Sequence, residues 1–195
     1  MSQPPAQHEE DKALVDAVLA GDTAAFERLV RQYQNLVWHV VFRMVRQAQD
    51  AQDLCQETFL RVHRYLHQYR SESALKSWIA QVAYSVAKRH LERKRIPISE
   101  APADADAPSP LDFVQDDFDL EGAYIDQQSA GRLHEAIDCL PPMQRTILTL
   151  YHLDEMPIAE IATVTGLAEG TIKSHLFRSR KHLREALNDS IGVAA

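Results

Sequence analysis

The sequence predicts an all-α protein made of two small helical domains that an acidic, flexible linker joins. In two long stretches, apolar residues recur at three- and four-residue spacing without the alternating pattern of strands. Between them lies a segment dominated by Pro, Ala, Asp and Ser, and the hydrophobic content of 45% suffices for packed cores. We therefore expect domains at residues 9–96 and 127–188, with a linker at 97–126.

The first domain is expected to be a helical bundle. Its apolar spacing is carried by Leu14, Val18, Phe26, Leu29, Val30, Tyr33, Val37, Val40, Val41 and Met44. Asp22 before Thr23 is typical of a helix start, and Ser71 to Ser73 predicts a loop before another helix. The bundle should end at Ile96-Pro97, because proline disfavours helical backbone in the residue before it.

The linker concentrates negative charge. Nine of the 28 acidic residues lie between Pro97 and Gln128, where no Lys or Arg occurs. The remaining 19 acids and 21 bases have a balance of +2, although the whole chain has a net charge of −7. The bases cluster at residues 88–95 and 173–184, so the pattern predicts contact with a polyanion at two places.

The second domain contains a predicted helix-turn-helix. Pro157 can open a helix, Gly166 permits a tight turn, and Ile161, Ile172 and Leu176 can pack inward. The second helix of this motif enters the DNA major groove. Its predicted outward residues suit base edges and phosphates: Thr171, Lys173, Ser174, Arg178 and Arg180. Thr165 stands where an apolar residue would pack better, and a merely solvated helical hairpin is the alternative.

A helix in the first domain should present an acidic stripe. On a helical wheel Asp50, Asp53 and Glu57 share one sector. A separate sector should face the core, made of Leu54, Thr58, Val62, Tyr65 and Tyr69. Spacing alone favours a solvated stripe in which Glu57 pairs with Arg61.

Further on, one short stretch combines aromatic residues with hydroxyls and cations: Trp78, Tyr84, Ser85, Lys88, Arg89 and Arg93. Such a group suits stacking on unpaired bases and phosphate neutralisation, whereas tryptophan is more often a core residue.

Catalytic, metal and cofactor sites are not predicted. His134-Glu135 begins like a zinc-protease motif but Asp138 replaces its second histidine, and His63 with His67 has no evident third ligand. Cys55 and Cys139 are expected to be reduced thiols. The polar start of the chain and the lack of a long apolar run predict a cytoplasmic protein without membrane insertion.

Taken together, these motifs resemble the sigma-70 family, in particular its extracytoplasmic-function (ECF) group. The segment Asp50-Ala-Gln-Asp-Leu-Cys-Gln-Glu-Thr-Phe is similar to the region 2 signature. Leu140-Pro-Pro-Met-Gln-Arg and Gly170-Thr-Ile-Lys-Ser-His-Leu-Phe-Arg-Ser-Arg are similar to region 4. Gln52, Leu75 and Ser85 depart from the usual residues. An autonomous helix-turn-helix repressor is the alternative, but it leaves the acidic stripe without a role.

The resemblance implies a factor that directs RNA polymerase core to specific promoters, without chemistry of its own, and that an anti-sigma factor sequesters. Binding to the clamp helices of the largest polymerase subunit is implied for Asp50, Asp53, Gln56, Glu57 and Phe59. Contacts to the minus-ten element of promoter DNA are implied for Trp78, Ser85, Lys88 and Arg89. Contacts to the minus-thirty-five element are implied for Glu169, Gly170, Thr171, Lys173, Ser174, Arg178 and Arg180.

Overall fold

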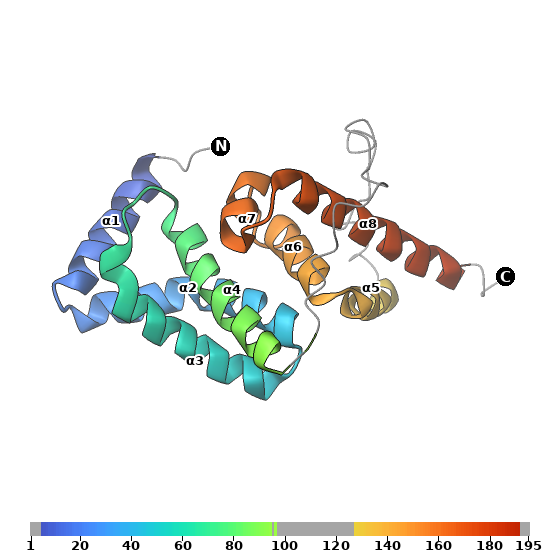
Figure 1. The fold of residues 1–195 in the computed structure, drawn as a ribbon, viewed down its shortest axis with the longest axis horizontal. Coiled ribbons are helices and arrows are strands. Elements are labelled where there is room, and N and C mark those ends of the chain that lie inside the picture. Colours follow the sequence, from blue (N-terminus) through green and yellow to red (C-terminus); the bar gives the residue numbers. More distant parts are fainter. Residues whose placement is uncertain (1–4, 95, 97–126, 192–195) are drawn as a thin grey trace.

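The computed structural model describes residues 5–94, 96 and 127–191, and every regular element among them is helical. The first group of elements comprises α1 (Pro5–Leu19), α2 (Thr23–Val45), α3 (Ala48–Tyr65), a 3-10 turn (Leu66–Gln68) and α4 (Leu75–Arg93). The second comprises α5 (Gln127–Cys139), α6 (Pro142–His152), α7 (Ile158–Thr165) and α8 (Glu169–Ile191). The all-α prediction is confirmed (Figure 1), and the predicted linker lies outside the described residues.

Local sequence signals set the ends of α2. The Asp22 carboxylate accepts hydrogen bonds from the backbone N–H groups of Ala24 (2.8 Å) and Ala25 (3.2 Å). These bonds satisfy donors that have no partner inside the helix, so the predicted start is confirmed. At the other end Arg46 adopts left-handed backbone, with φ of 59°, and its N–H caps the Phe42 carbonyl.

The first domain packs α2 against both α3 and α4. Leu29 and Val37 on α2, Val62 on α3 and Ile79 on α4 are fully buried. On α3, Leu54, Thr58 and Val62 are buried as predicted, whereas Tyr65 is 39% exposed. The helix ends at Tyr65 and the chain tightens into the 3-10 turn, where Leu66 takes the buried place instead.

The second domain contains the predicted helix-turn-helix. After α7 the chain turns at Gly166, whose φ of 76° favours glycine, and the Gly166 N–H bonds to the Ala162 carbonyl at 2.8 Å. Ile161, Ile172 and Leu176 are buried, which confirms their predicted role as anchors. Helix α8 then crosses α5, α6 and α7 (Figure 1).

Thr165 corrects one expectation. Its hydroxyl donates a hydrogen bond to the Ile161 carbonyl (2.7 Å) and accepts one from the Leu167 N–H (3.3 Å). An apolar side chain at this buried position would leave the turn without that acceptor. The threonine therefore suits the turn better than an apolar residue.

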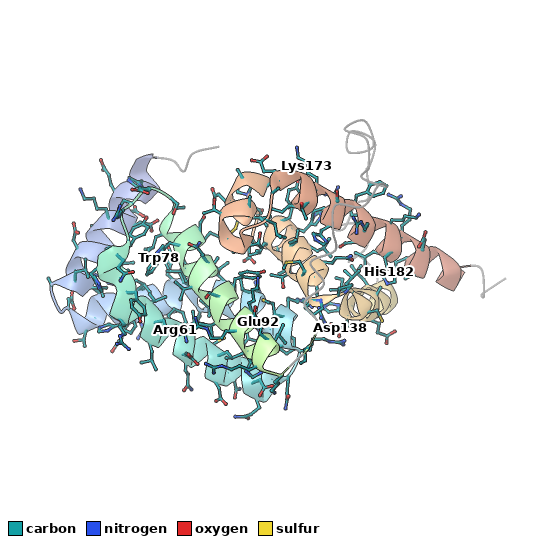
Figure 2. The ribbon with its side chains drawn as sticks, in the orientation of Figure 1. Arg61, Trp78, Glu92, Asp138, Lys173 and His182 are labelled. Carbon is teal, nitrogen blue, oxygen red and sulfur yellow. The ribbon has the colours of Figure 1, made fainter. Side chains whose placement is uncertain are left out.

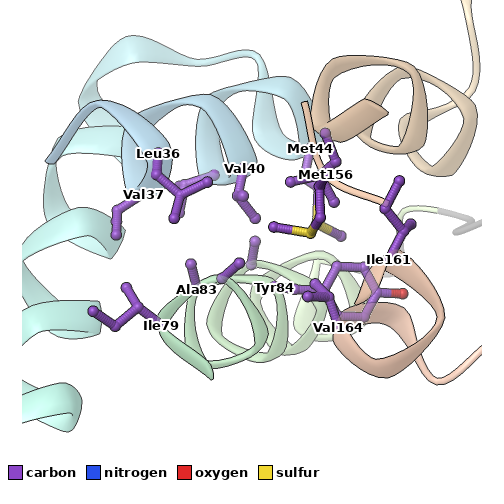
Figure 3. Packing of buried hydrophobic residues seen from close by; sticks show 14 of the residues in the cluster. Leu36, Val37, Val40, Met44, Ile79, Ala83, Tyr84, Met156, Ile161 and Val164 are labelled. Atoms are coloured by element: carbon purple, nitrogen blue, oxygen red, sulfur yellow. The ribbon is translucent and has the colours of Figure 1, made fainter. Parts of the chain in front are cut away.

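The two domains pack directly on each other. Helix α6 lies against α2, and α7 lies against α4. Figure 3 shows Met156, Ile161 and Val164 of the second domain beside α2 and α4. Their buried side chains join those of the first domain in one continuous core.

Candidate functional site

The acidic stripe of α3 lines an open cleft of about 810 Å³. Asp53 and Gln56 are exposed and Glu57 is half-buried. The same cleft is also lined by basic and polar side chains, namely Arg61, Arg64, Tyr65, Gln68 and Arg89. Arg61 donates to the Glu57 carboxylate at 2.6 Å, as its spacing predicted. The surface therefore offers both carboxylates and cations to a partner.

Asp50 lies apart from that cleft. Its carboxylate accepts a hydrogen bond from the Lys94 ammonium (2.6 Å) and lies 3.4 Å from His90 Nε2, so it ties α3 to the end of α4. The Lys94 hydrogen bond, followed by the nearby charges of Lys94 and His90, lowers the pKa of Asp50 below its usual value. Asp50 is thus an anchor between two helices as well as part of the stripe.

Phe59 faces a different depression. It lines a groove of about 420 Å³ between α2 and α3, together with Val30, Trp38 and Cys55. Gln56 lines both this groove and the acidic cleft. Trp38 stacks on Phe42 with 5.1 Å between ring centroids. The five residues assigned to polymerase contact therefore spread over two adjacent faces of α3.

Leu60 is a surface residue that the sequence did not single out. It is 71% exposed and lines the acidic cleft beside Glu57 and Arg61. An isolated exposed leucine is common, but this one stands among charged side chains on a candidate interface. On the helical wheel Leu60 falls outside the apolar sector of α3, and this position already indicated that the side chain is exposed.

Helix α4 carries the residues assigned to the minus-ten element. Trp78 is half-buried and contacts Tyr69 at 5.7 Å between ring centroids, so it packs on the core with one part accessible. Ser85 and Arg89 are exposed and Lys88 is half-buried. The last three line a cleft of about 300 Å³ together with residues 163–166 of the second domain.

The N-terminal end of α8 carries the residues assigned to the minus-thirty-five element. Glu169 and Gly170 are exposed, whereas Thr171, Lys173 and Arg178 are half-buried. The Ser174 hydroxyl, also half-buried, donates to the Gly170 carbonyl at 3.0 Å. Figure 2 shows Lys173 on α8, on the far side of the second domain from Arg61 of α3. This helix end is therefore held by buried anchors and open to solvent.

Arg180 differs from its predicted outward placement. Its guanidinium lies 5.5 Å from the ring centroid of Tyr151 on α6, in a cation–π geometry. Because that aromatic ring comes from a distant part of the chain, helical periodicity in α8 did not indicate it. The structure therefore separates Arg180 from the cluster at residues 169–174.

Two histidines lie in the interior of the second domain, His175 buried on α8 and His152 half-buried at the end of α6. His175 is 2% exposed, and burial followed by the charge of Arg178 lowers its pKa. Burial, with a smaller effect from Arg180, lowers the pKa of His152 to about 4. Within the described part of the chain, neither nitrogen of His175 has a hydrogen-bond partner. Both rings therefore serve as uncharged packing groups at neutral pH.

The described residues hold no group of three metal-ligating side chains. Nor is any of their helices both long enough and apolar enough to cross a bilayer.

Comparison with protein families assigns both domains. The model of Sigma-70 region 2 matches residues 29–96, and that of Sigma-70 region 4 matches residues 130–183. The chain belongs to the sigma-70 family. Region 2 thus covers most of α2 together with α3 and α4, and region 4 contains the helix-turn-helix.

Whole-length relatives place this sigma factor in the ECF group. It is 34% identical over 186 residues to the RNA polymerase sigma-H factor of Pseudomonas aeruginosa, covering 92% of this chain and 94% of the relative. It is 31% identical to the ECF RNA polymerase sigma-E factor of Escherichia coli K12, covering 88% and 91%. The protein is therefore a transcription initiation factor that binds RNA polymerase core and directs it to specific promoters.

The fold also matches a solved sigma factor. RpoE of Bartonella quintana, in complex with the anti-sigma factor NepR, superposes with a TM-score of 0.57 and 19% identity. The match covers 84% of this chain and 96% of RpoE.

Proposed function

We propose that the sigma factor uses three separate surfaces to bind the polymerase and the two promoter elements. The α3 surface, consisting of Asp50, Asp53, Gln56, Glu57, Leu60 and Phe59, binds the clamp helices of the largest polymerase subunit. The α4 surface, consisting of Trp78, Ser85, Lys88 and Arg89, engages the minus-ten element. The α8 surface, consisting of Glu169, Gly170, Thr171, Lys173, Ser174 and Arg178, reads the minus-thirty-five element, with Arg180 in support.

The acidic cleft carries this proposal. Carboxylates at Asp53 and Glu57 stand beside an exposed apolar side chain, Leu60. Charged groups steer association and fix register, and an apolar residue adds affinity when it is covered. Charges of both signs around an exposed apolar side chain suit a protein partner that carries complementary charges of its own.

On α8, residues at different positions along the helix make different kinds of DNA contact. In a helix-turn-helix the N-terminal residues of the second helix reach base edges. Thr171 and Lys173 lie in the first turns of α8, and Arg178 lies farther along. We therefore assign Thr171 and Lys173 to base contacts and Arg178 to the phosphate backbone.

The protein has no catalytic role of its own in this proposal, and it acts in the cytoplasm, where its polymerase and promoters are. Sequestration by an anti-sigma factor is part of the proposal, because a solved sigma factor of the same fold is bound to one. The inhibitor would cover the surfaces that the polymerase or the promoter needs.

The test is run-off transcription with purified core polymerase on a library of promoter fragments. We expect initiation from a restricted set of fragments that share minus-ten and minus-thirty-five sequences. Core polymerase alone is the control. Equal transcription with and without the protein would contradict the proposed function.

A further inference from the structure

A buried carboxylate stands on the apolar face of α1. Asp11 is 2% exposed and shares this face with Val15 and Val18, which follow it at helical spacing and are also buried. A carboxylate at such a position costs free energy unless it is hydrogen-bonded, whereas an apolar side chain would fill the position without that cost. Asp11 therefore indicates a directional contact between α1 and the rest of the first domain.

Tyr33 of α2 provides that contact. The Tyr33 hydroxyl donates to Asp11 Oδ1 at 3.0 Å and accepts from Gln32 Nε2 at 3.1 Å. Burial, followed by the charge of Asp11, raises the pKa of the Tyr33 phenol, so the hydroxyl keeps the proton that it donates. Because a hydrogen bond has a preferred direction, the pair fixes how α1 is rotated against α2.

Helix α1 also lies against the 3-10 turn at Leu66–Gln68, and Figure 1 shows it beside the segment that connects α3 to α4. Tyr69 is the first residue after the turn. Burial raises the pKa of the Tyr69 phenol; a hydrogen bond with Ser71 lowers it, and the charge of Asp11 raises it further. Asp11, Tyr33 and Tyr69 therefore form one polar cluster behind this connection.

Tyr69 closes the connection between α3 and α4. Its hydroxyl donates to the Ser73 carbonyl at 2.7 Å, and between these two residues Ser71 adopts left-handed backbone, with φ of 58°. A non-glycine residue keeps that conformation only where the surrounding structure fixes it. Ala74, which precedes α4, forms no side-chain cap, so the start of α4 depends on this closed loop.

Trp78 stands on the helix that begins at this loop. Its ring centroid lies 5.7 Å from that of Tyr69, and its backbone N–H bonds to the Ala74 carbonyl at 3.1 Å. Figure 2 shows Trp78 on the end of α4 nearer to α1. Two residues of the loop therefore set the position of Trp78.

We propose that Asp11 and Tyr33 are positioning residues for promoter opening: by fixing α1 behind the loop that Tyr69 closes, they hold Trp78 in the orientation that engages the minus-ten element. Both side chains are buried, so they act through the loop and not by touching DNA or polymerase. Helix α1 precedes residue 29, where the match to region 2 begins, so the inference gives a role to an element outside that match. It rests on the proposed role of Trp78.

Four variants separate the hydrogen bond from the packing. Asp11→Leu removes the acceptor, whereas Asp11→Asn keeps a carbonyl oxygen in its place. Tyr33→Phe removes the donor. The double variant Asp11→Leu/Tyr33→Phe removes both partners of the bond, and replacing both by apolar groups is close to neutral for stability. Asp16→Leu, on the exposed side of α1, is the matched control.

The first measurement is promoter opening by the holoenzyme, followed by permanganate reactivity of unpaired thymines in a fragment selected in the run-off experiment. Asp11→Leu and Tyr33→Phe should lower opening about tenfold, the effect of losing one hydrogen bond to a charged group, with unchanged affinity for core polymerase. Asp11→Asn should stay near wild type. The double variant should regain the melting temperature of the wild type but not its promoter opening, because apolar contacts do not fix the rotation of α1.

The second measurement follows Trp78 by fluorescence in the free protein. The chain has two tryptophans, so Trp38→Phe leaves Trp78 as the only one. In this background Asp11→Leu and the double variant should increase the quenching of Trp78 by acrylamide, and Asp11→Asn should not. This measurement needs neither polymerase nor promoter, so it tests the inference separately from the proposed function.

The inference fails if the double variant regains promoter opening together with stability, because packing alone would then explain both losses. It also fails if core affinity falls in parallel with opening, if Asp16→Leu has the same effects, or if the quenching of Trp78 is equal in all variants. Normal promoter opening by Trp78→Ala would instead contradict the proposed function, because the quenching results in the free protein do not depend on it.

Discussion

Glu57 and Arg61 form an ion pair one turn apart on α3, with 2.6 Å between Oε1 and Nη2. The pair lies in the acidic cleft, and both side chains remain partly accessible, at 45% for Glu57 and 25% for Arg61. An exposed pair of this kind adds little to stability. In the proposed function, this pair orients the Glu57 carboxylate toward the polymerase.

Reversing the charge of Asp53 and Glu57 to Lys should weaken binding to core polymerase by about tenfold or more, because it removes complementary charge from the interface. Fluorescence titration of labelled sigma factor with core polymerase measures the effect. The control is Asp16→Lys/Glu27→Lys, two exposed acids on α1 and α2, of which Glu27 also pairs with an arginine one turn away. Equal affinities of the two double variants would refute the assignment of the cleft.

Lys173→Ala or Thr171→Ala should change the order of preferred minus-thirty-five sequences, by about 1–3 kcal/mol at one base position. Arg178→Ala should instead weaken binding to all sequences alike and reduce the salt dependence by about one phosphate contact. Holoenzyme binding to promoters with single substitutions, repeated at several salt concentrations, separates these effects. An unchanged sequence preference in both N-terminal variants would show that the reading surface lies elsewhere.

Thr165→Val should lower the free energy of unfolding by about 1 kcal/mol, because the half-buried Leu167 N–H loses its acceptor. Thr163→Val is the matched control, since the Thr163 hydroxyl also bonds to the carbonyl one turn earlier (3.1 Å) but is exposed. Urea denaturation followed by circular dichroism measures both. If Thr163→Val lowers the free energy of unfolding as much as Thr165→Val does, the hydrogen bond from the Leu167 N–H does not stabilise the turn.

Acid should destabilise region 4 through His152. Its pKa is about 4 in the folded protein, below the ordinary 6.5, so the unfolded chain binds more protons between these values. The free energy of unfolding should therefore fall by about 1–2 kcal/mol as the pH drops from 7 to 4, an amount reduced from the full shift because the ring is partly accessible. His152→Phe should remove this part of the pH dependence, whereas His182→Phe, at an exposed position of α8, should retain it. Identical pH profiles for wild type and His152→Phe would exclude the mechanism.

Elements with local signals were predictable from the sequence. Asp22 starts α2 through its own side chain, and Gly166 supplies the turn of the helix-turn-helix. In each case the physical cause lies within a few residues of the position. The acidic stripe was likewise visible, because it needs only the helical period.

Features that depend on distant parts of the chain were not predictable. Arg180 was expected to face outward, but Tyr151 from α6 provides an aromatic surface for it. Tyr65 was predicted to face the core because it continues the helical period of α3. The helix ends at Tyr65, so the period no longer fixes the direction of its side chain. The packing of region 4 on region 2, including the bond between Ser77 and Glu160, has no periodic signature in either segment.

The order of the helices along the chain has a consequence during synthesis. The last residue of α4 leaves the ribosome about 70 residues before the last residue of α7. At about 5–20 residues per second this delay is roughly 4–14 s. During that interval the nascent region 2 presents Met44 and Tyr84 to solvent, so a chaperone or binding partner meets a bare surface that the finished protein covers.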